Sequence, residues 1–448
     1  MSGATRKQEN SLPAPIRWST ITPSEQEALL ERPVFGAGAG IEKAVAGIVR
    51  RVREQGDEAL RALTERYDGV ALDDFRVGEA EFRAADDALS PASLAAIDTA
   101  IANVRRFHEA QVSPDIDLET MPGVRCQRLT RPIDAVGLYV PAGSAPLPSA
   151  AIMLAVPADI AGCPRRVLCT PPRADGTADS AVLAAARRAG VSEVYKIGGA
   201  QAIAALAFGT ASIPRVDKIF GPGNAWVTAA KSLVAGMPGG PAIDMPAGPS
   251  EVLVIADDGA RADFVAADLL SQAEHGPDSQ VVLLTTSEQL AQDVAAALPA
   301  QLAALDRADI AVRALAHGRL IVVDDLDAAA ELSNRYAPEH LIVQTRAPRA
   351  LLPALRNAGS VFLGPYTPES VGDYCSGTNH VLPTYGAARA FSGLGVDQFV
   401  RRMTVQELDA DGLAALAPSV TELARLEGLD AHAQAVTIRL ARAPGDEA

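Results

Sequence analysis

The chain has 448 residues, of which 48% are hydrophobic, and its 40 Lys and Arg face 55 Asp and Glu for a formal net charge of −15. This length predicts about three structural units with large cores, which excludes a single small domain. An acidic chain lacks a broad basic surface for phosphates or anionic lipid, so nucleic acid and membranes are not expected partners.

The sequence shows no targeting or membrane segment. No apolar run follows Arg6 and Lys7, as it would in a signal peptide. The longest apolar stretch, 150–162, contains Pro157 and Asp159 and falls short of the ~20 residues of a spanning helix. Four scattered cysteines form no CxxC pair. We therefore expect a cytoplasmic protein with free thiols.

Helices are expected in the first quarter of the chain. Apolar residues recur every three or four positions over 41–67, and a second such stretch runs over 79–111, where His108 is expected to face solvent or to cap the end of the helix. The pattern then changes, because 131–140 is short, apolar and followed by a Pro- and Gly-rich cluster, which predicts a buried strand.

Strands and helices alternate from there to about residue 363. Strand-like segments separated by helical patterns lie at 167–170, 193–197, 218–220, 252–255, 281–285, 320–323, 341–343 and 360–363. A Pro- and Gly-rich gap at 236–249 divides them into two groups, which predicts two α/β lobes, each a sheet covered by helices on both faces. After about 396 no further strand is expected, and 405–442 predicts a helical tail.

Neither lobe carries the full G-x-G-x-x-G fingerprint of dinucleotide-binding folds. Gly221-Pro-Gly-Asn-Ala-Trp226 follows a predicted strand and opens a helix, but Trp226 replaces the third glycine and Pro222 stiffens the turn. Backbone amides at a helix N-terminus can still hold phosphate. The pattern permits a nucleotide without requiring one.

Several histidines lie where a metal could bind. Gln272 and His275 stand three residues apart at a predicted helix end, where both could reach one ion, although a histidine there can also serve only as a cap. Asp373 and His380 lie in the polar segment 364–384, expected to be a long functional loop, and His432 lies in the tail. Zinc accepts such nitrogen and oxygen ligands, but no spacing proves that these residues meet.

Glu339 and His340 lie side by side after a proline in Tyr-Ala-Pro-Glu-His-Leu. A carboxylate beside an imidazole offers two bases of different pKa, which suits a reaction with more than one proton to move.

At these residues the chain resembles the histidinol dehydrogenase family. The resemblance covers about 41–440 in family order and is carried by the blocks 136–143, 198–202, 216–224, 244–252, 270–276, 334–341, 372–374, 377–380 and 427–432. Ala142 and Leu147 depart from the family pattern, and the departure concerns only the cofactor pocket.

The resemblance implies NAD-dependent oxidation of L-histidinol to L-histidine through L-histidinaldehyde, the last steps of histidine biosynthesis, with one zinc per subunit. Gln272, His275, Asp373 and His432 match the family's zinc ligands. Glu339 and His340 match its proton acceptors, and Tyr139, Gln201 and Asn224 match its NAD contacts. The positions that match substrate binding are Ser250, Gln272, His275, His340, Asp373, His380, Glu427 and His432.

The resemblance also implies an intertwined homodimer, in which Glu427 and His432 of the tail complete the partner's site. The expected fold is α/β, with two incomplete Rossmann-like lobes, an N-terminal helical arm and a C-terminal helical tail. We divide the chain into the arm (1–34), a first lobe with most metal and catalytic residues (35–138 and 250–394), an NAD-binding second lobe (139–249) and the tail (395–448).

Other functions stay open at this point. A zinc hydrolase could use Glu339 to activate water, and a related dehydrogenase could oxidise another small amino- or sulfo-alcohol. Cys375 could act as a covalent nucleophile, although no basic neighbour in sequence lowers its pKa. A non-catalytic scaffold would have no need of a Glu-His pair beside four ligand-type residues.

Overall fold

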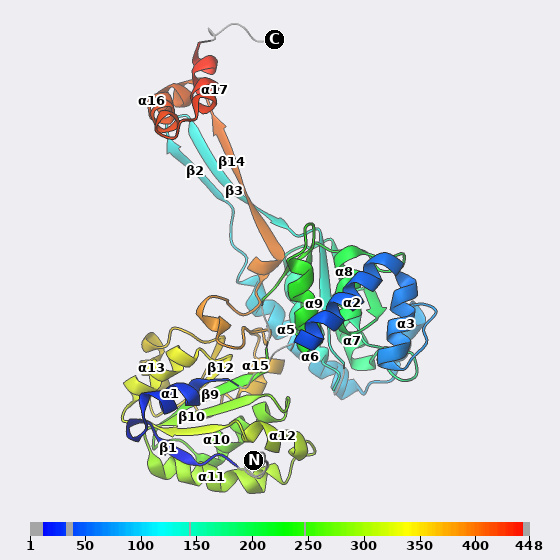
Figure 1. Cartoon of the computed structure of the whole chain (residues 1–448), viewed down its shortest axis with the longest axis vertical. Coiled ribbons are helices and arrows are strands. Elements are labelled where there is room, and N and C mark those ends of the chain that lie inside the picture. The colour runs from blue at the N-terminus through cyan, green and yellow to red at the C-terminus, as the bar shows by residue number, and fades with distance from the viewer. Residues whose placement is uncertain (1–11, 33–38, 143–144, 246–247, 442–448) are drawn as a thin grey trace.

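The computed structural model describes residues 12–32, 39–142, 145–245 and 248–441, which form two lobes and a projecting extension (Figure 1). The first lobe is built on a six-stranded parallel sheet. Its strands lie in the spatial order β1 (Pro15–Arg17), β11 (Arg319–Val322), β10 (Gln280–Thr285), β9 (Glu251–Ala256), β12 (His340–Gln344) and β13 (Ser360–Leu363).

Helices cover both faces of this sheet. Val252 and Val254 of β9 pack beneath α10 (Ala262–Ala273), α11 (Glu288–Leu302) and α12 (Ala308–Leu315). Leu253 and Ile255, which point the opposite way, pack beneath α1 (Pro23–Leu30), α13 (Leu326–Tyr336) and α14 (Pro348–Leu351). The uninterrupted apolar run of β9 is therefore the sequence of a strand buried on both sides, as predicted.

The second lobe is built on a five-stranded parallel sheet. Its strands lie in the order β6 (Glu193–Lys196), β5 (Arg165–Thr170), β4 (Ala135–Tyr139), β7 (Lys218–Phe220) and β8 (Ala242–Ile243). One face is covered by α4 (Glu79–Asp87), α5 (Pro91–Glu109), α6 (Pro148–Ile160) and α7 (Ser180–Arg188), and the other by α2 (Ala39–Gln55), α3 (Asp57–Asp68), α8 (Gly199–Phe208) and α9 (Ala225–Ala235).

The helices α2 to α5 thus lie on the second lobe, whereas the sequence division placed 35–138 in the first. Val45 and Leu60 pack on one face of the five-stranded sheet, and Phe82 and Val104 pack on the other. The predicted helix 41–67 divides at Gly56, whose φ of 55° breaks the helix, and the predicted helix 79–111 also divides in two. His108 lies in the last turn of α5 and is fully buried rather than solvent-facing.

The extension is a three-stranded antiparallel ribbon in the order β14 (Val400–Leu408), β3 (Val124–Pro132) and β2 (Ile116–Met121), with α16 (Ala410–Leu426) and α17 (Asp430–Leu440) at its far end (Figure 1). The tail is therefore not helical throughout. The predicted strand 131–140 is also two strands, because the chain leaves the ribbon after Pro132 and enters the five-stranded sheet at Ala135.

The remaining elements are short. Helix α15 (Glu369–Tyr374) interrupts the polar segment 364–384 that was expected to be a loop, and 3₁₀ turns lie at Trp18–Thr20, Leu352–Ala354, Ala387–Arg389 and Val396–Phe399. Among the described helices, none combines the length and the apolar character that a bilayer crossing requires. The α/β class with two parallel-sheet lobes, an arm and a tail is confirmed.

Candidate active site

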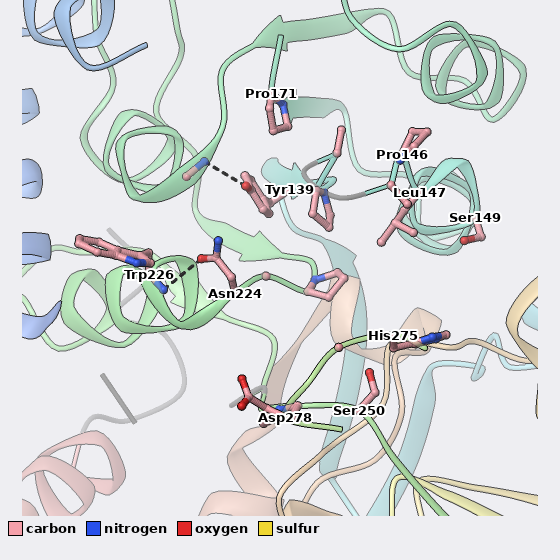
Figure 2. Close-up of a pocket in the computed structure, with 18 of the residues that line it drawn as sticks. Tyr139, Pro146, Leu147, Ser149, Pro171, Asn224, Trp226, Ser250, His275 and Asp278 are labelled. Carbon is pink, nitrogen blue, oxygen red and sulfur yellow. Dashed lines mark hydrogen bonds between the residues drawn. The ribbon is translucent and has the colours of Figure 1, made fainter. Parts of the chain in front are cut away.

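A cavity of about 1080 Å³ lies where the two lobes meet. Figure 2 shows Tyr139 and Asn224 of the second lobe on one side, across from Ser250 and His275 of the first. The predicted site residues that line this cavity are Tyr139, Gln201, Asn224, Ser250, His275, Glu339, His340, Asp373 and His380. The structure therefore brings most of the predicted site together from segments far apart in the chain.

The side of the cavity formed by the second lobe consists of strand ends and helix beginnings. The backbone N–H of Gly199, at the start of α8, donates to the Tyr139 hydroxyl at 3.0 Å, and burial raises the pKa of Tyr139 to about 12. Asn224 caps α9, with its Oδ1 accepting from the N–H of Trp226 at 3.1 Å. Its carboxamide oxygen is therefore occupied, and its NH₂ group is the part free to donate to a ligand.

The turn before Asn224 is held in place by hydrogen bonds to Lys231 and Asp244. The Gly221 N–H donates to Asp244 at 2.8 Å, the Gly221 carbonyl accepts from Lys231 at 2.8 Å, and Lys231 and Asp244 form an ion pair at 2.5 Å. A Cβ at Gly221 would lie 2.1 Å from the Tyr139 carbonyl oxygen, so only glycine fits. The turn that opens α9 is held rigidly without the third glycine of the fingerprint.

Glu339 and His340 lie between α13 and β12, at the start of β12, which is flanked by β9 and β13 in the first lobe's sheet. The side chains of both residues are buried, and His340 Nδ1 lies 3.6 Å from Glu339 Oε2. On its other side, His340 Nε2 lies 3.5 Å from Asp373 Oδ1. The imidazole therefore stands between two carboxylates at the cavity wall.

Burial and neighbouring charges together set the pKa values of this pair. Removal from water raises the pKa of Glu339 to about 7. Burial would lower the pKa of the imidazole, but the carboxylates of Glu339, Asp373 and Glu369 outweigh it and raise that pKa to about 10. A carboxyl group that titrates near neutral pH can exchange protons with a substrate at that pH.

Three of the four predicted metal ligands lie near one another. Gln272 is in the last turn of α10, which ends at Ala273, and His275 follows two residues beyond it, its backbone N–H donating to the Gln272 carbonyl. Asp373, on α15, raises the pKa of His275 by charge attraction, although desolvation has the larger effect and lowers it. In the described part of the chain, neither polar atom of the buried Gln272 carboxamide has a hydrogen-bond partner.

His432 and Glu427 lie elsewhere. His432 is exposed on α17 and Glu427 is exposed at the end of α16, both on the far end of the extension (Figure 1). Within residues 12–32, 39–142, 145–245 and 248–441, no three His, Cys, Asp or Glu side chains are grouped to hold an ion. A single chain therefore assembles only part of the predicted metal site. Cys375 is not among the residues that line the cavity.

Two supporting interactions were not predicted from the sequence. Asn379, beside His380, donates to the Met153 carbonyl at 2.8 Å and lies 3.4 Å from His108 Nε2, which anchors the segment carrying His380. Ser271, beside Gln272, donates to Glu369 at 2.7 Å, and this joins α10 to α15. A lone histidine in an amphipathic helix and a serine in a helix carry no pattern that would reveal these contacts.

These features define a two-lobed α/β enzyme with one cavity between the lobes. The Glu339–His340 pair lines it on one side, and the N-terminus of α9 lines it on the other. A model of the family described as histidinol dehydrogenase matches residues 36–440. The chain belongs to the histidinol dehydrogenase family and is an oxidoreductase.

Individual relatives agree with this assignment over nearly the whole chain. A histidinol dehydrogenase of Xanthomonas axonopodis pv. citri is 58% identical over 425 residues, which are 95% of this chain and 98% of that protein. One of Aliivibrio fischeri is 56% identical over 423 residues, covering 94% and 95%. The crystal structure of histidinol dehydrogenase from Elizabethkingia anophelis superposes with a TM-score of 0.92 at 44% identity, covering 96% of this chain and 98% of that one.

Proposed function

We propose that this chain oxidises L-histidinol to L-histidine through L-histidinaldehyde in the cytoplasm, with NAD as the hydride acceptor and one Zn²⁺ per subunit. The observation that carries the proposal is the shared cavity, in which Glu339, His340 and Asp373 of one lobe lie across from Tyr139, Gln201 and Asn224 of the other. The relatives named as histidinol dehydrogenases supply the substrate.

The residues present suit a metal ion. The Gln272 carboxamide is buried without a partner among the described residues, the His275 ring has a lowered pKa that keeps it neutral, and Asp373 supplies a carboxylate. This mixed nitrogen and oxygen donor set is one that zinc accepts. When bound, zinc would act as a Lewis acid that anchors the substrate's nitrogen atoms, and NAD would accept the hydride.

We assign the two proton transfers to the buried pair. In the first oxidation, the neutral form of the His340 ring takes the hydroxyl proton at Nε2 as hydride leaves the carbinol carbon. In the second, Glu339 takes a proton from the water that attacks the aldehyde carbon, and the hydrated aldehyde gives up the second hydride. Two bases with different surroundings can thus serve two steps in one cavity.

We further propose a homodimer whose tails complete each other's sites, with Glu427 and His432 acting in trans. The extension exposes apolar side chains that a second subunit could cover, among them Leu118, Met403, Leu426, Leu429 and Ile438. Because His432 lies on the extension and away from its own chain's cavity, a second copy is the simplest source of the missing ligand.

The proposed reaction is tested by stoichiometry and by metal removal. With L-histidinol and NAD, we expect about two reduced nicotinamides per histidinol consumed, because two hydrides leave the substrate. Chelation should abolish turnover, and added Zn²⁺ should restore it. Absorbance of the reduced cofactor gives the amount of nicotinamide reduced and the turnover rate, and chromatography gives the histidinol consumed and the histidine formed. A zinc hydrolase would form no reduced nicotinamide, and a dehydrogenase of another amino- or sulfo-alcohol would leave histidinol unconsumed.

The aldehyde step should depend on pH through Glu339. Its pKa of about 7 means that the carboxylate needed as a base is scarce at low pH and complete above neutrality. With L-histidinaldehyde as the substrate, the rate should therefore rise as pH increases through about 7 and level off above it. A profile that is flat from about pH 5.5 to 8.5 would show that an ordinary carboxyl group, or none, is the base.

A further inference from the structure

Arg32, at the end of the N-terminal arm, is inserted into the first lobe behind the acid–base pair. Its Nε donates to Glu251 Oε1 at 2.5 Å and its Nη2 donates to Oε2 at 3.0 Å, while its guanidinium carbon lies 3.9 Å from the centre of the Tyr336 ring. The two side chains are 11% and 2% exposed. Burial of an ion pair carries a large desolvation cost that its attraction often only offsets, so stability alone is a weak reason for the pair.

The peptide groups of Glu251 contact both residues of the acid–base pair. Its N–H donates to Glu339 Oε2 at 2.9 Å, and its carbonyl oxygen lies 3.0 Å from His340 Nδ1. Because a carbonyl only accepts, Nδ1 must carry a proton. In the neutral ring the lone pair is then on Nε2, which is buried 3.5 Å from Asp373 Oδ1 and has no hydrogen-bond partner in the described structure.

Arg32 also holds the turn that leads into the pair. Its Nη2 donates to the Tyr336 carbonyl at 2.8 Å and lies 3.4 Å from the Ala337 carbonyl oxygen. Ala337 has a φ of 55°, which is a left-handed conformation that alanine adopts at an energetic cost. The Arg32 guanidinium therefore joins the strained turn before Glu339 to Glu251, whose peptide groups contact the side chains of Glu339 and His340.

We propose that Arg32 and Glu251 are positioning residues that fix the orientation of Glu339 and the tautomer of His340, so that the N-terminal arm is part of the catalytic apparatus. The Glu251 carboxylate accepts from the Tyr385 N–H as well, at 2.9 Å, which locks its side chain from a third direction. The inference rests on the proposed roles of Glu339 and His340.

The first test is Arg32→Met in the full-length, zinc-loaded enzyme. Loss of the ion pair frees the turn and the Glu251 peptide, so kcat should fall about tenfold to a hundredfold in both oxidations. KM for histidinol and for NAD should stay within about threefold, because Arg32 does not line the cavity. Arg32→Lys, which keeps the charge but not the paired donors, should recover part of kcat.

The matched control is Glu27→Gln, which breaks an exposed ion pair between α1 of the same arm and Arg335. It should leave kcat unchanged, because exposed pairs contribute little. If Arg32→Met does not fold, Glu251→Gln provides the same test, since it keeps the backbone groups and loses the ion pair. Wild-type kcat in either folded variant, or an equal loss in Glu27→Gln, would overturn the proposal.

A second readout needs no turnover. In protein labelled with ¹⁵N-histidine and observed where the ring is neutral, His340 should show a protonated Nδ1, and Arg32→Met should shift that nitrogen toward an average of two tautomers. An unchanged Nδ1 in the variant would contradict the positioning role. Absence of histidinol oxidation in the wild type would instead reject the proposed reaction, while the ring signal would still decide the role of Arg32.

Discussion

Replacing Glu339 with Gln should slow oxidation of L-histidinaldehyde by about 10²- to 10⁴-fold while leaving oxidation of L-histidinol to the aldehyde within about threefold. The amide keeps the size of the side chain, and its oxygen can still accept from the Glu251 N–H, but it cannot take a proton from water. Single-turnover measurements, started separately from the alcohol and from the aldehyde, resolve the two steps.

Glu274→Gln is the control for this substitution, since Glu274 also lines the cavity, whereas the carboxylates paired with His340 among the described residues are Glu339 and Asp373. Both steps should proceed normally in that variant. If Glu339→Gln slows the two oxidations equally, Glu339 has a general structural or electrostatic role, and the base for the water lies elsewhere.

Mixing two inactive variants should restore activity. We expect His275→Ala and His432→Ala each to lose zinc and turnover, because each would remove a ligand. In a mixed dimer, the intact lobe of the His432→Ala chain would meet the intact tail of the His275→Ala chain, so one complete site re-forms. Random exchange should therefore return about one quarter of wild-type activity, since half of the dimers are mixed and each has one working site.

Differently tagged subunits and bound zinc provide the controls for this experiment. Recovered activity should co-purify with dimers that carry both tags, and these should hold about one zinc per dimer. If subunits exchange and no activity returns, each site is built within one chain. A separate result, wild-type zinc content in His432→Ala, would assign the fourth ligand to another residue.

The buried parts of the fold could be predicted from the sequence because burial leaves a pattern. The apolar run 252–255 predicts a strand covered on both faces, and it is the centre of β9. The amphipathic helices of 41–67 and 79–111 were recognised too, but an amphipathic pattern shows only that a face is covered, not by which sheet. The assignment of α2 to α5 to the second lobe therefore needed three-dimensional structure.

The exposed strand of the extension and the buried ion pair of the arm left no such pattern in the sequence. Strand β14 is mostly exposed, and its apolar residues, Val400, Met403, Val405 and Leu408, do not recur at every second position, so its sequence lacks the period of two that marks a strand. Arg32 lies just past a short helix of the arm, with no motif around it. Glu251 offered one signal, because an acidic residue that begins a fully apolar strand requires a buried cationic partner.

The candidate site divides in the same way. Glu339 and His340 stand out as a sequence motif, and the structure places them at the cavity, while their catalytic roles stay predictions. His275 and Asp373 come from separate segments to line one cavity, and the His275 N–H bonds to the Gln272 carbonyl, an arrangement that spacing alone could not establish. His432 lies on α17 at the far end of the extension, so its role as a ligand rests on the proposed homodimer.

In the proposed homodimer, the length of the ribbon makes turnover depend on protein concentration. β3 has nine residues, and at a rise of ~3.3 Å per residue it carries α16 and α17 roughly 30 Å beyond the second lobe. With a tail held at that distance, a complete site in the proposed assembly obeys mass action. Turnover per chain would then fall on dilution, before either lobe loses its fold.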